Sequence, residues 1–186
     1  MRRLTSLLLP IVLTLSFGLS CLGQSIRFIP IHFHSDPEVG STRAQADNQI
    51  KNLNQIYSDQ NTPFRFTIHS IDNEPIRKGG AGDLNVYVHE IPTRPFYVLA
   101  YATWPWNYKK EPELDGIHLR PLVADSGVVL AHEIGHWLGI YHDSVPLRYG
   151  IPNCMDTPKM ETTDKRCYFN SEQLETMRVN YDLYRK

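Results

Sequence analysis

Residues 132–142 read His-Glu-Ile-Gly-His-Trp-Leu-Gly-Ile-Tyr-His, an instance of the pattern His-Glu-x-x-His-x-x-Gly-x-x-His. Residues four apart on an α-helix project from the same face, so the imidazoles of His132 and His136 can bind one Zn²⁺ together. Gly139 can adopt the left-handed conformation that ends a helix, and the chain can then turn back and supply His142 as a third ligand. Three protein ligands leave a fourth position for water, which is typical of a catalytic zinc site.

Glu133 directly follows the first histidine, so its carboxylate can face water on the metal. The spacing therefore predicts one Zn²⁺ per chain, held by His132, His136 and His142. It also predicts hydrolysis of a peptide bond by zinc-activated water, with Glu133 as the general base. The alternative is a helix with incidental histidines, but Gly139 and the third histidine at the correct offsets argue against it.

Hydrophobic periodicity predicts a mixed α/β domain around this helix, which we place at 128–138. Apolar residues alternate in four other segments, where we expect strands: 26–33, 64–68, 84–88 and 117–119. The segment 92–116 is rich in proline and aromatic residues, and we expect long loops there with at most one short strand.

Two further helices are predicted. Ser41 or Thr42 can cap the first, in which apolar residues recur at helical spacing up to Tyr57. After the irregular stretch 143–169, a capping box of Asn170 with Gln173, or a cap by Ser171, begins a C-terminal helix.

The N-terminus has the pattern of a secretory signal peptide. Arg2 and Arg3 precede a mostly apolar stretch at 4–19, and small residues such as Ser20 and Gly23 follow it. We expect cleavage of residues 1–23, leaving 24–186 as a single secreted domain. The competing interpretation is cleavage before Cys21 with a lipid anchor at the cell envelope. Gly18 argues against it, because lipoprotein signals usually carry an aliphatic residue at that position.

Composition limits the choice of partners. The 186 residues include 19 basic and 20 acidic side chains, with a formal net charge of −1. No basic stripe is present, so nucleic acid is not an expected partner. No segment beyond the signal is apolar and long enough for a transmembrane span. Signal removal leaves Cys154 and Cys167, which we expect to form a disulfide in an oxidising compartment; the alternative is two buried thiols.

The histidine motif, together with a later methionine, resembles the metzincin signature. In the segment Asn153-Cys154-Met155-Asp156, Met155 matches the Met-turn residue of that class. The resemblance implies an apolar floor of Met155 beneath the three imidazoles. It further implies an α+β fold with a twisted, mostly parallel sheet, two long helices and an active-site cleft. The upper subdomain would span about 24–139, and a small lower one with one helix about 140–186.

More narrowly, the chain is similar to the pappalysin (cytophagalysin) family from about Ile26 to Met177. The matching pieces are 49–58, 84–88, 101–105, 114–117, 131–142, 153–156 and 169–177. Each piece outside the histidine motif is short, and their shared order carries the resemblance. It implies a secreted zinc-dependent endopeptidase whose peptide or protein substrate lies extended along an exposed sheet edge.

The chain departs from this family at Thr157, where relatives often have a tyrosine that can stabilise the oxyanion. Tyr149 is a substitute by position only. The acidic loops that hold calcium in some relatives are missing, so calcium dependence does not carry over from the resemblance and stays open. A second class of function stays open, a zinc-stabilised binding or toxin-like module without catalysis. The intact Glu133 argues against it.

Other histidines and tryptophans allow weaker hypotheses. His32 and His34 share one face of a strand and are spaced as a metal pair could be, although such residues more often face solvent. His118 is expected near the cleft. Trp104 and Trp106 could line a substrate pocket or pack beneath a loop.

Overall fold

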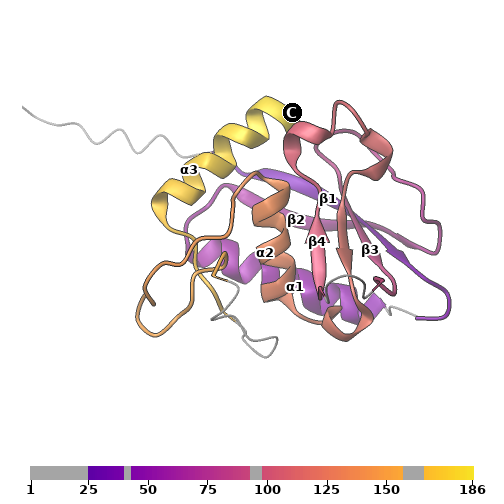
Figure 1. Cartoon of the computed structure of the whole chain (residues 1–186), viewed down its shortest axis with the longest axis horizontal. Helices are drawn as coiled ribbons and strands as arrows, with labels where there is room; N and C mark the ends of the chain where they lie inside the picture. Colours follow the sequence, from indigo (N-terminus) through magenta and orange to yellow (C-terminus); the bar gives the residue numbers. More distant parts are fainter. Residues whose placement is uncertain (1–24, 40–42, 93–97, 157–165) are drawn as a thin grey trace, which may run out of the picture.

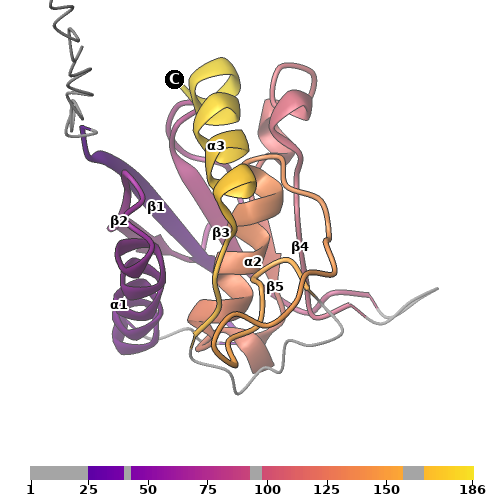
Figure 2. The ribbon, with the colours of Figure 1, turned by 90° about the vertical axis from the view of Figure 1, so that its left-hand side faces the viewer.

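The structure is a computed structural model, and it describes residues 25–39, 43–92, 98–156 and 166–186. Within these residues it forms one five-stranded sheet with two helices on one face (Figure 1, Figure 2). The strands are β1 (Arg27–Ser35), β2 (Phe64–Asp72), β3 (Leu84–Val88), β4 (Ala100–Ala102) and β5 (Ile117–Leu119). The helices are α1 (Arg43–Asp59), α2 (Gly127–Trp137) and α3 (Ser171–Asn180), which continues into a π-helical turn, η5 (Tyr181–Arg185).

The strand order is β2-β1-β3-β5-β4. The first four strands in that order are parallel, and β4 pairs antiparallel with β5. In the part of the chain that the structure describes, β4 is therefore an edge strand. The observed sheet confirms the expected fold class, a mixed α/β architecture with a mostly parallel sheet.

The hydrophobic core lies between the sheet and the two helices. Alternate residues of β1, Ile29, Ile31 and Phe33, are almost fully buried and face α1. The helices α1 and α2 pack closely where α2 begins, because a Cβ on Gly127 would lie 2.6 Å from the Cβ of Asn52. This packing fixes the position of the helix that carries the first two histidines.

The predicted elements match the structure closely. The helix expected at 128–138 lies one residue earlier, and Ser126 caps it by accepting a hydrogen bond from the Val129 amide. The capping box is confirmed: Asn170 Oδ1 accepts from the Gln173 amide, and Gln173 Oε1 accepts from the Asn170 amide, both at 2.9 Å. No helix in the described ranges is long and apolar enough to cross a membrane.

Some expectations differ from the structure or fall outside it. The first two strands extend further than predicted, to Ser35 and Asp72, because their last residues still pair with each other and with β3. The short strand expected within 92–116 is β4. The cap at Ser41 or Thr42 and the signal peptide, including Cys21, lie outside the described residues.

The C-terminal turn is tied to α2 by a buried cation. Arg185 is 1% exposed, and its Nη1 donates to Asp115 Oδ2 at 2.7 Å. The guanidinium lies 4.0 Å from the centre of the Trp137 ring and donates to the Trp137 carbonyl. Because Trp137 ends α2, this contact connects the last turn of the chain to the helix of the histidine motif.

We expect Arg185→Met to lower the free energy of unfolding by about 3–5 kcal/mol, because it leaves the Asp115 carboxylate buried beside less positive charge. Urea unfolding measures this loss. Lys186→Met is the matched control, since that side chain is 75% exposed, and it should change the free energy by less than about 0.5 kcal/mol. Equal effects of the two substitutions would contradict a structural role for the buried ion pair.

Candidate metal centre and active site

Three histidine side chains converge beside α2. His132 and His136 lie one turn apart on the helix, and Nε2 of His142 lies 3.1 Å from the Nε2 of His132 and 3.0 Å from that of His136. Gly139 makes the turn that brings the third histidine back, with the expected positive φ of 87°. A Cβ at Gly139 would lie 2.2 Å from Nδ2 of Asn180, so close packing also favours glycine there.

The hydrogen bonds of two of these histidines fix their tautomers. His132 Nδ1 lies 2.6 Å from the Cys154 carbonyl oxygen, and His136 Nδ1 lies 2.7 Å from that of Ile140. A carbonyl only accepts, so each Nδ1 carries the proton and each Nε2 presents a lone pair. Burial lowers the pKa of both histidines to about 4, which keeps them neutral.

This arrangement suits a metal cation. Lone pairs on neighbouring Nε2 atoms repel each other unless a donor or a cation lies between them. The three ligand atoms all lie within 4.8 Å of one another, and this is the one such group of three in the described residues. Neutral imidazoles with Nδ1 bonded to a carbonyl are the usual form of zinc-binding histidine. The residues present therefore fit a zinc ion.

The segment that carries Met155 lies directly beneath the helix. The Met155 side chain is fully buried, and its sulfur would lie only 2.4 Å from a Cβ built on Gly135. Gly135 lies between His132 and His136 in the sequence, so the sulfur packs against the helix backbone between these two histidines. The Asp143 amide donates to the Met155 carbonyl at 3.2 Å, which ties the stretch after His142 to the same segment.

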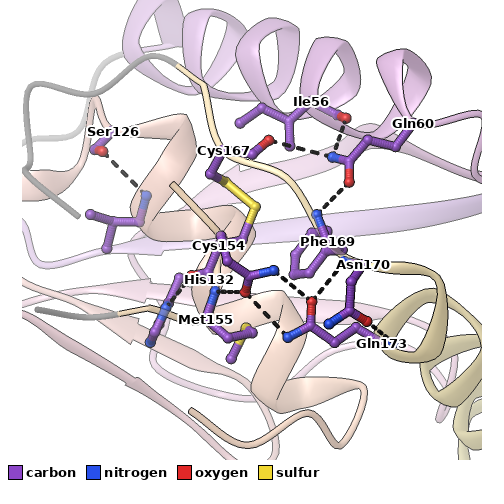
Figure 3. The surroundings of a disulfide bond; sticks show 12 residues. Ile56, Gln60, Ser126, His132, Cys154, Met155, Cys167, Phe169, Asn170 and Gln173 are labelled. Atoms are coloured by element: carbon purple, nitrogen blue, oxygen red, sulfur yellow. Dashed lines mark hydrogen bonds between the residues drawn. A yellow bond between two sulfur atoms is a disulfide. The ribbon is translucent and has the colours of Figure 1, made fainter. Parts of the chain in front are cut away.

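A disulfide and a pair of amides hold this segment in place (Figure 3). Cys154 and Cys167 are bonded, as expected from the sequence. The Asn153 amide donates to Gln173 Oε1 at 2.9 Å, and the Gln173 amide donates back to Asn153 Oδ1 at 3.2 Å. Asn153 Oδ1 also accepts from the Met155 backbone. Gln173 thus connects the start of α3 to the methionine segment, a role that its capping-box position alone did not indicate.

Glu133, which follows His132 on α2, is buried. Its side chain is 5% exposed, and Oε2 has no hydrogen-bond partner among the described residues. Burial raises the pKa of this carboxyl to about 8. A divalent cation on the neighbouring imidazoles would oppose that shift, because an opposite charge favours the carboxylate.

Aromatic side chains border the site on the side of His136. Trp104 and Trp106 stack at 5.1 Å, and Trp104 also lies 5.2 Å from the His136 ring and 4.6 Å from the Tyr141 ring. The sequence allowed either a pocket wall or packing beneath a loop for these tryptophans. The structure places Trp104 next to His136, and Trp106 lies against Trp104 and Tyr141.

Several other candidates lie elsewhere. Tyr149 is 93% exposed in a turn, and Thr157 lies outside the described residues. His32 and His34 are buried, contrary to the expectation that they face solvent, because β1 is a central strand. His118 packs within the sheet and does not join the three converging histidines.

His34 is engaged by polar side chains on both ring nitrogens. Its Nδ1 lies 3.0 Å from a carboxylate oxygen of Asp72, and its Nε2 lies 2.8 Å from Asn85 Oδ1. The backbone of Lys78 fixes the Asn85 amide, since the Lys78 amide donates to Oδ1 and the Lys78 carbonyl accepts from Nδ2. Both ring nitrogens of His34 therefore lie against side-chain oxygens within the sheet. His32 and His34 do not belong to the described group of three converging ligand atoms.

Comparison with known proteins agrees with this site. No family model matches the chain. It is 30% identical to human pappalysin-1 over 126 residues, which are 63% of this chain and 8% of that protein. It is also 30% identical over 129 residues to an extracellular metalloprotease of Colletotrichum graminicola, covering 54% of this chain and 44% of the relative. The matched region therefore spans less than half the length of these relatives.

The fold has a solved counterpart in mature mirolysin of Tannerella forsythia, determined in complex with a cleaved peptide. The two superpose with a TM-score of 0.58 at 16% identity, over 85% of this chain and 92% of that one. The fold is similar to that of mirolysin, and the sequence is similar to that of pappalysin-1, which supports a relationship to the pappalysin-like metzincins.

We expect the double variant Cys154→Ala, Cys167→Ala to lose about 2–3 kcal/mol of unfolding free energy, because the bond closes a loop with a sequence separation of 13. Zinc affinity should fall as well, since the Cys154 carbonyl orients His132. Urea unfolding and a competitive zinc titration measure the two effects. Reduced wild-type protein should behave like the variant, and an unchanged urea midpoint in both would contradict the prediction.

Proposed function

We propose that the protein is a secreted zinc-dependent endopeptidase. The observation that carries the proposal is the convergence of three imidazole Nε2 atoms beside a helix that also carries the buried Glu133, next to His132 in the sequence. The relative named as an extracellular metalloprotease, the similarity to pappalysin-1 and the cleaved peptide bound to mirolysin support it. The catalytic domain would be 24–186, with an upper part at about 24–139 and a lower part at about 140–186.

His132, His136 and His142 would hold the metal, one ion per chain. When bound, zinc supplies a Lewis acid that polarises both a water molecule and the substrate carbonyl. The Cys154 and Ile140 carbonyls keep two of the imidazoles in the tautomer that binds metal. Met155 would form the apolar floor beneath them.

Glu133 would move the proton. Its carboxylate accepts a proton from the attacking water and then donates it to the nitrogen of the leaving amine, while the C–N bond breaks. Oε2 of this buried carboxyl has no hydrogen-bond partner among the described residues, so it is available to accept a proton and to return it.

The peptide would bind along the free edge of β4. The Leu99 carbonyl accepts from the Arg120 amide, and the Thr103 amide donates to the Gly116 carbonyl, so these residues point their backbone groups towards β5. In an antiparallel pair this orientation alternates, which turns the N–H and C=O groups of Ala100 and Ala102 towards the open edge. An extended substrate could add to the sheet through these groups.

Glu133→Gln should keep one bound zinc per chain and lose hydrolysis of an unfolded protein by a factor of about 100–10,000, because the general base is removed. Zinc content by mass spectrometry and cleavage of casein, with and without a chelator, measure this. Glu38→Gln, an exposed change, is the control, whereas His142→Ala should lose the metal. Wild-type turnover in Glu133→Gln would refute its role, and a zinc-loaded wild type that cleaves nothing would favour a non-catalytic binding module.

Export is part of the proposal, supported by the disulfide and by the relative named as extracellular. The mature protein should begin at Gln24 after signal cleavage, and no lipid should be attached. Mass spectrometry of protein collected from the medium measures both. A mature chain that begins at Cys21 with the mass of a diacylglycerol group would instead place the protein at the cell envelope.

A further inference from the structure

One row of side chains crosses all five strands on the sheet face opposite α1 and α2. Its members are paired directly from strand to strand in the order Asp72, His34, Tyr87, His118, Tyr101. The rings of Tyr87 and Tyr101 stack on the His118 ring from the strands on either side, at centroid distances of 4.8 and 4.4 Å. This stacking fixes the plane of the His118 ring.

A second histidine faces His118 from the end of β3. His89 lies two residues after Tyr87, so both side chains project from the same face of the sheet. The His89 amide donates to the Leu119 carbonyl, which continues the pairing of β3 with β5. Nε2 of His89 lies 2.9 Å from Nδ1 of His118, and the ring centres are 5.2 Å apart.

This spacing is close to that of the three converging histidines beside α2. Among those three, the neighbouring Nε2 atoms are 3.0 and 3.1 Å apart, and the ring centres are 4.7 to 5.0 Å apart. Two nitrogens that each lie about 2.0–2.1 Å from one zinc ion are separated by about 3.3 Å in tetrahedral geometry. A shift of a few tenths of an ångström therefore gives the pair on the sheet the spacing of two ligands of one ion.

A hydrogen bond determines which nitrogen of His89 carries the proton. Its Nδ1 lies 3.1 Å from the backbone carbonyl oxygen of Glu90, which only accepts, so Nε2 presents a lone pair. His132 and His136 have the same bonding. Without a metal, the Nδ1 proton of His118 is donated to this lone pair.

The His118 ring can exchange that proton for a metal ion. Burial lowers its pKa to about 4, and the neighbouring His89 lowers it further, so the ring is neutral at pH 7. When its proton moves from Nδ1 to Nε2, the ring stays neutral and Nδ1 presents a second lone pair beside the first.

The two histidines line an acidic pocket of about 700 Å³ that also includes the rings of the row. The pocket carries the carboxylates of Asp36 and Glu113, and none of the described residues that line it is a lysine or an arginine. Acidic side chains around neutral nitrogens favour a cation over an anion. The pocket also has room for the water molecules that an ion with two protein ligands needs to complete its coordination.

We propose that His89 and His118 form a second metal site, separate from the three-histidine site, for a divalent transition metal ion such as Zn²⁺. Imidazole nitrogen suits zinc, whereas calcium and magnesium bind oxygen ligands. Because the site has two protein ligands in place of three, it is weaker and fills only after the three-histidine site. An ion there would connect the end of β3 to β5. This inference does not rest on proteolysis.

Zinc titration of the purified protein tests the proposal. Equilibrium dialysis against rising free zinc, with bound metal measured by mass spectrometry, should show one ion per chain at low zinc and a second at higher zinc. His118→Phe keeps the stacked ring but has no nitrogen ligand, and His89→Ala removes the other ligand. Each variant should bind the first ion normally and lose the second. His69→Ala is the matched control, since this exposed histidine does not line the pocket, and it should still bind two.

His142→Ala separates the two sites, because it should lose the tight ion and still bind one at the higher zinc concentration. Long-range ¹H–¹⁵N NMR of the histidine rings then identifies the ligand atoms. As the weaker site fills, Nδ1 of His118 should lose its proton to Nε2, while Nδ1 of His89 should keep its own.

Wild-type protein that stops at one ion overturns the second site and leaves the endopeptidase proposal intact. A second ion that remains in both His89→Ala and His118→Phe, or that is also lost in His69→Ala, overturns it as well. Protein that binds two zinc ions and cleaves nothing overturns the proposed function and supports the second site.

Discussion

The structure depends on holding the Nε2 atoms of three imidazoles close together. Helical spacing alone accomplishes this for His132 and His136. The third histidine needs a sharp reversal of the chain, and Gly139 permits it through a positive φ. Without bonds that orient the rings, such an arrangement would relax by turning them apart. The carbonyl oxygens of Cys154 and Ile140 prevent this by accepting from Nδ1.

The need to orient the imidazole rings explains why the segment after α2 is fixed by so many contacts. The carbonyl of Cys154 can orient His132 only if its own segment is fixed, and this segment has little regular secondary structure. A disulfide, the paired amides of Asn153 and Gln173, and the sulfur of Met155 against the helix backbone provide the rigidity. The Asn180 side chain on α3 also donates to the carbonyl of Leu138, at the end of α2. Helix α3 therefore contacts both the segment of Met155, through Gln173, and the end of α2, through Asn180.

The sequence predicted those parts of the site that depend on local spacing. The ligand pattern, the glycine turn, the capping box and the fold class follow from periodicities within a few residues. The partners of Arg185 and Gln173 could not be predicted in this way, since they lie 70 and 20 positions away. The row that ends at Tyr101 depends on the register of four strand pairs. A register shift beside His32, where β2 has an irregularity, shows how easily one residue changes the facing side chains.

Strand β4 lies at one edge of the described sheet and carries side chains on both of its faces. Its alanines pack towards α2 and the core, while Tyr101 points to the opposite face with the stacked row. A peptide that adds to this edge has the same alternation, because successive side chains of a strand point to opposite faces. Neighbouring substrate residues would therefore meet different surroundings, one set on the side of the metal helix and the other on the side of the acidic, aromatic pocket.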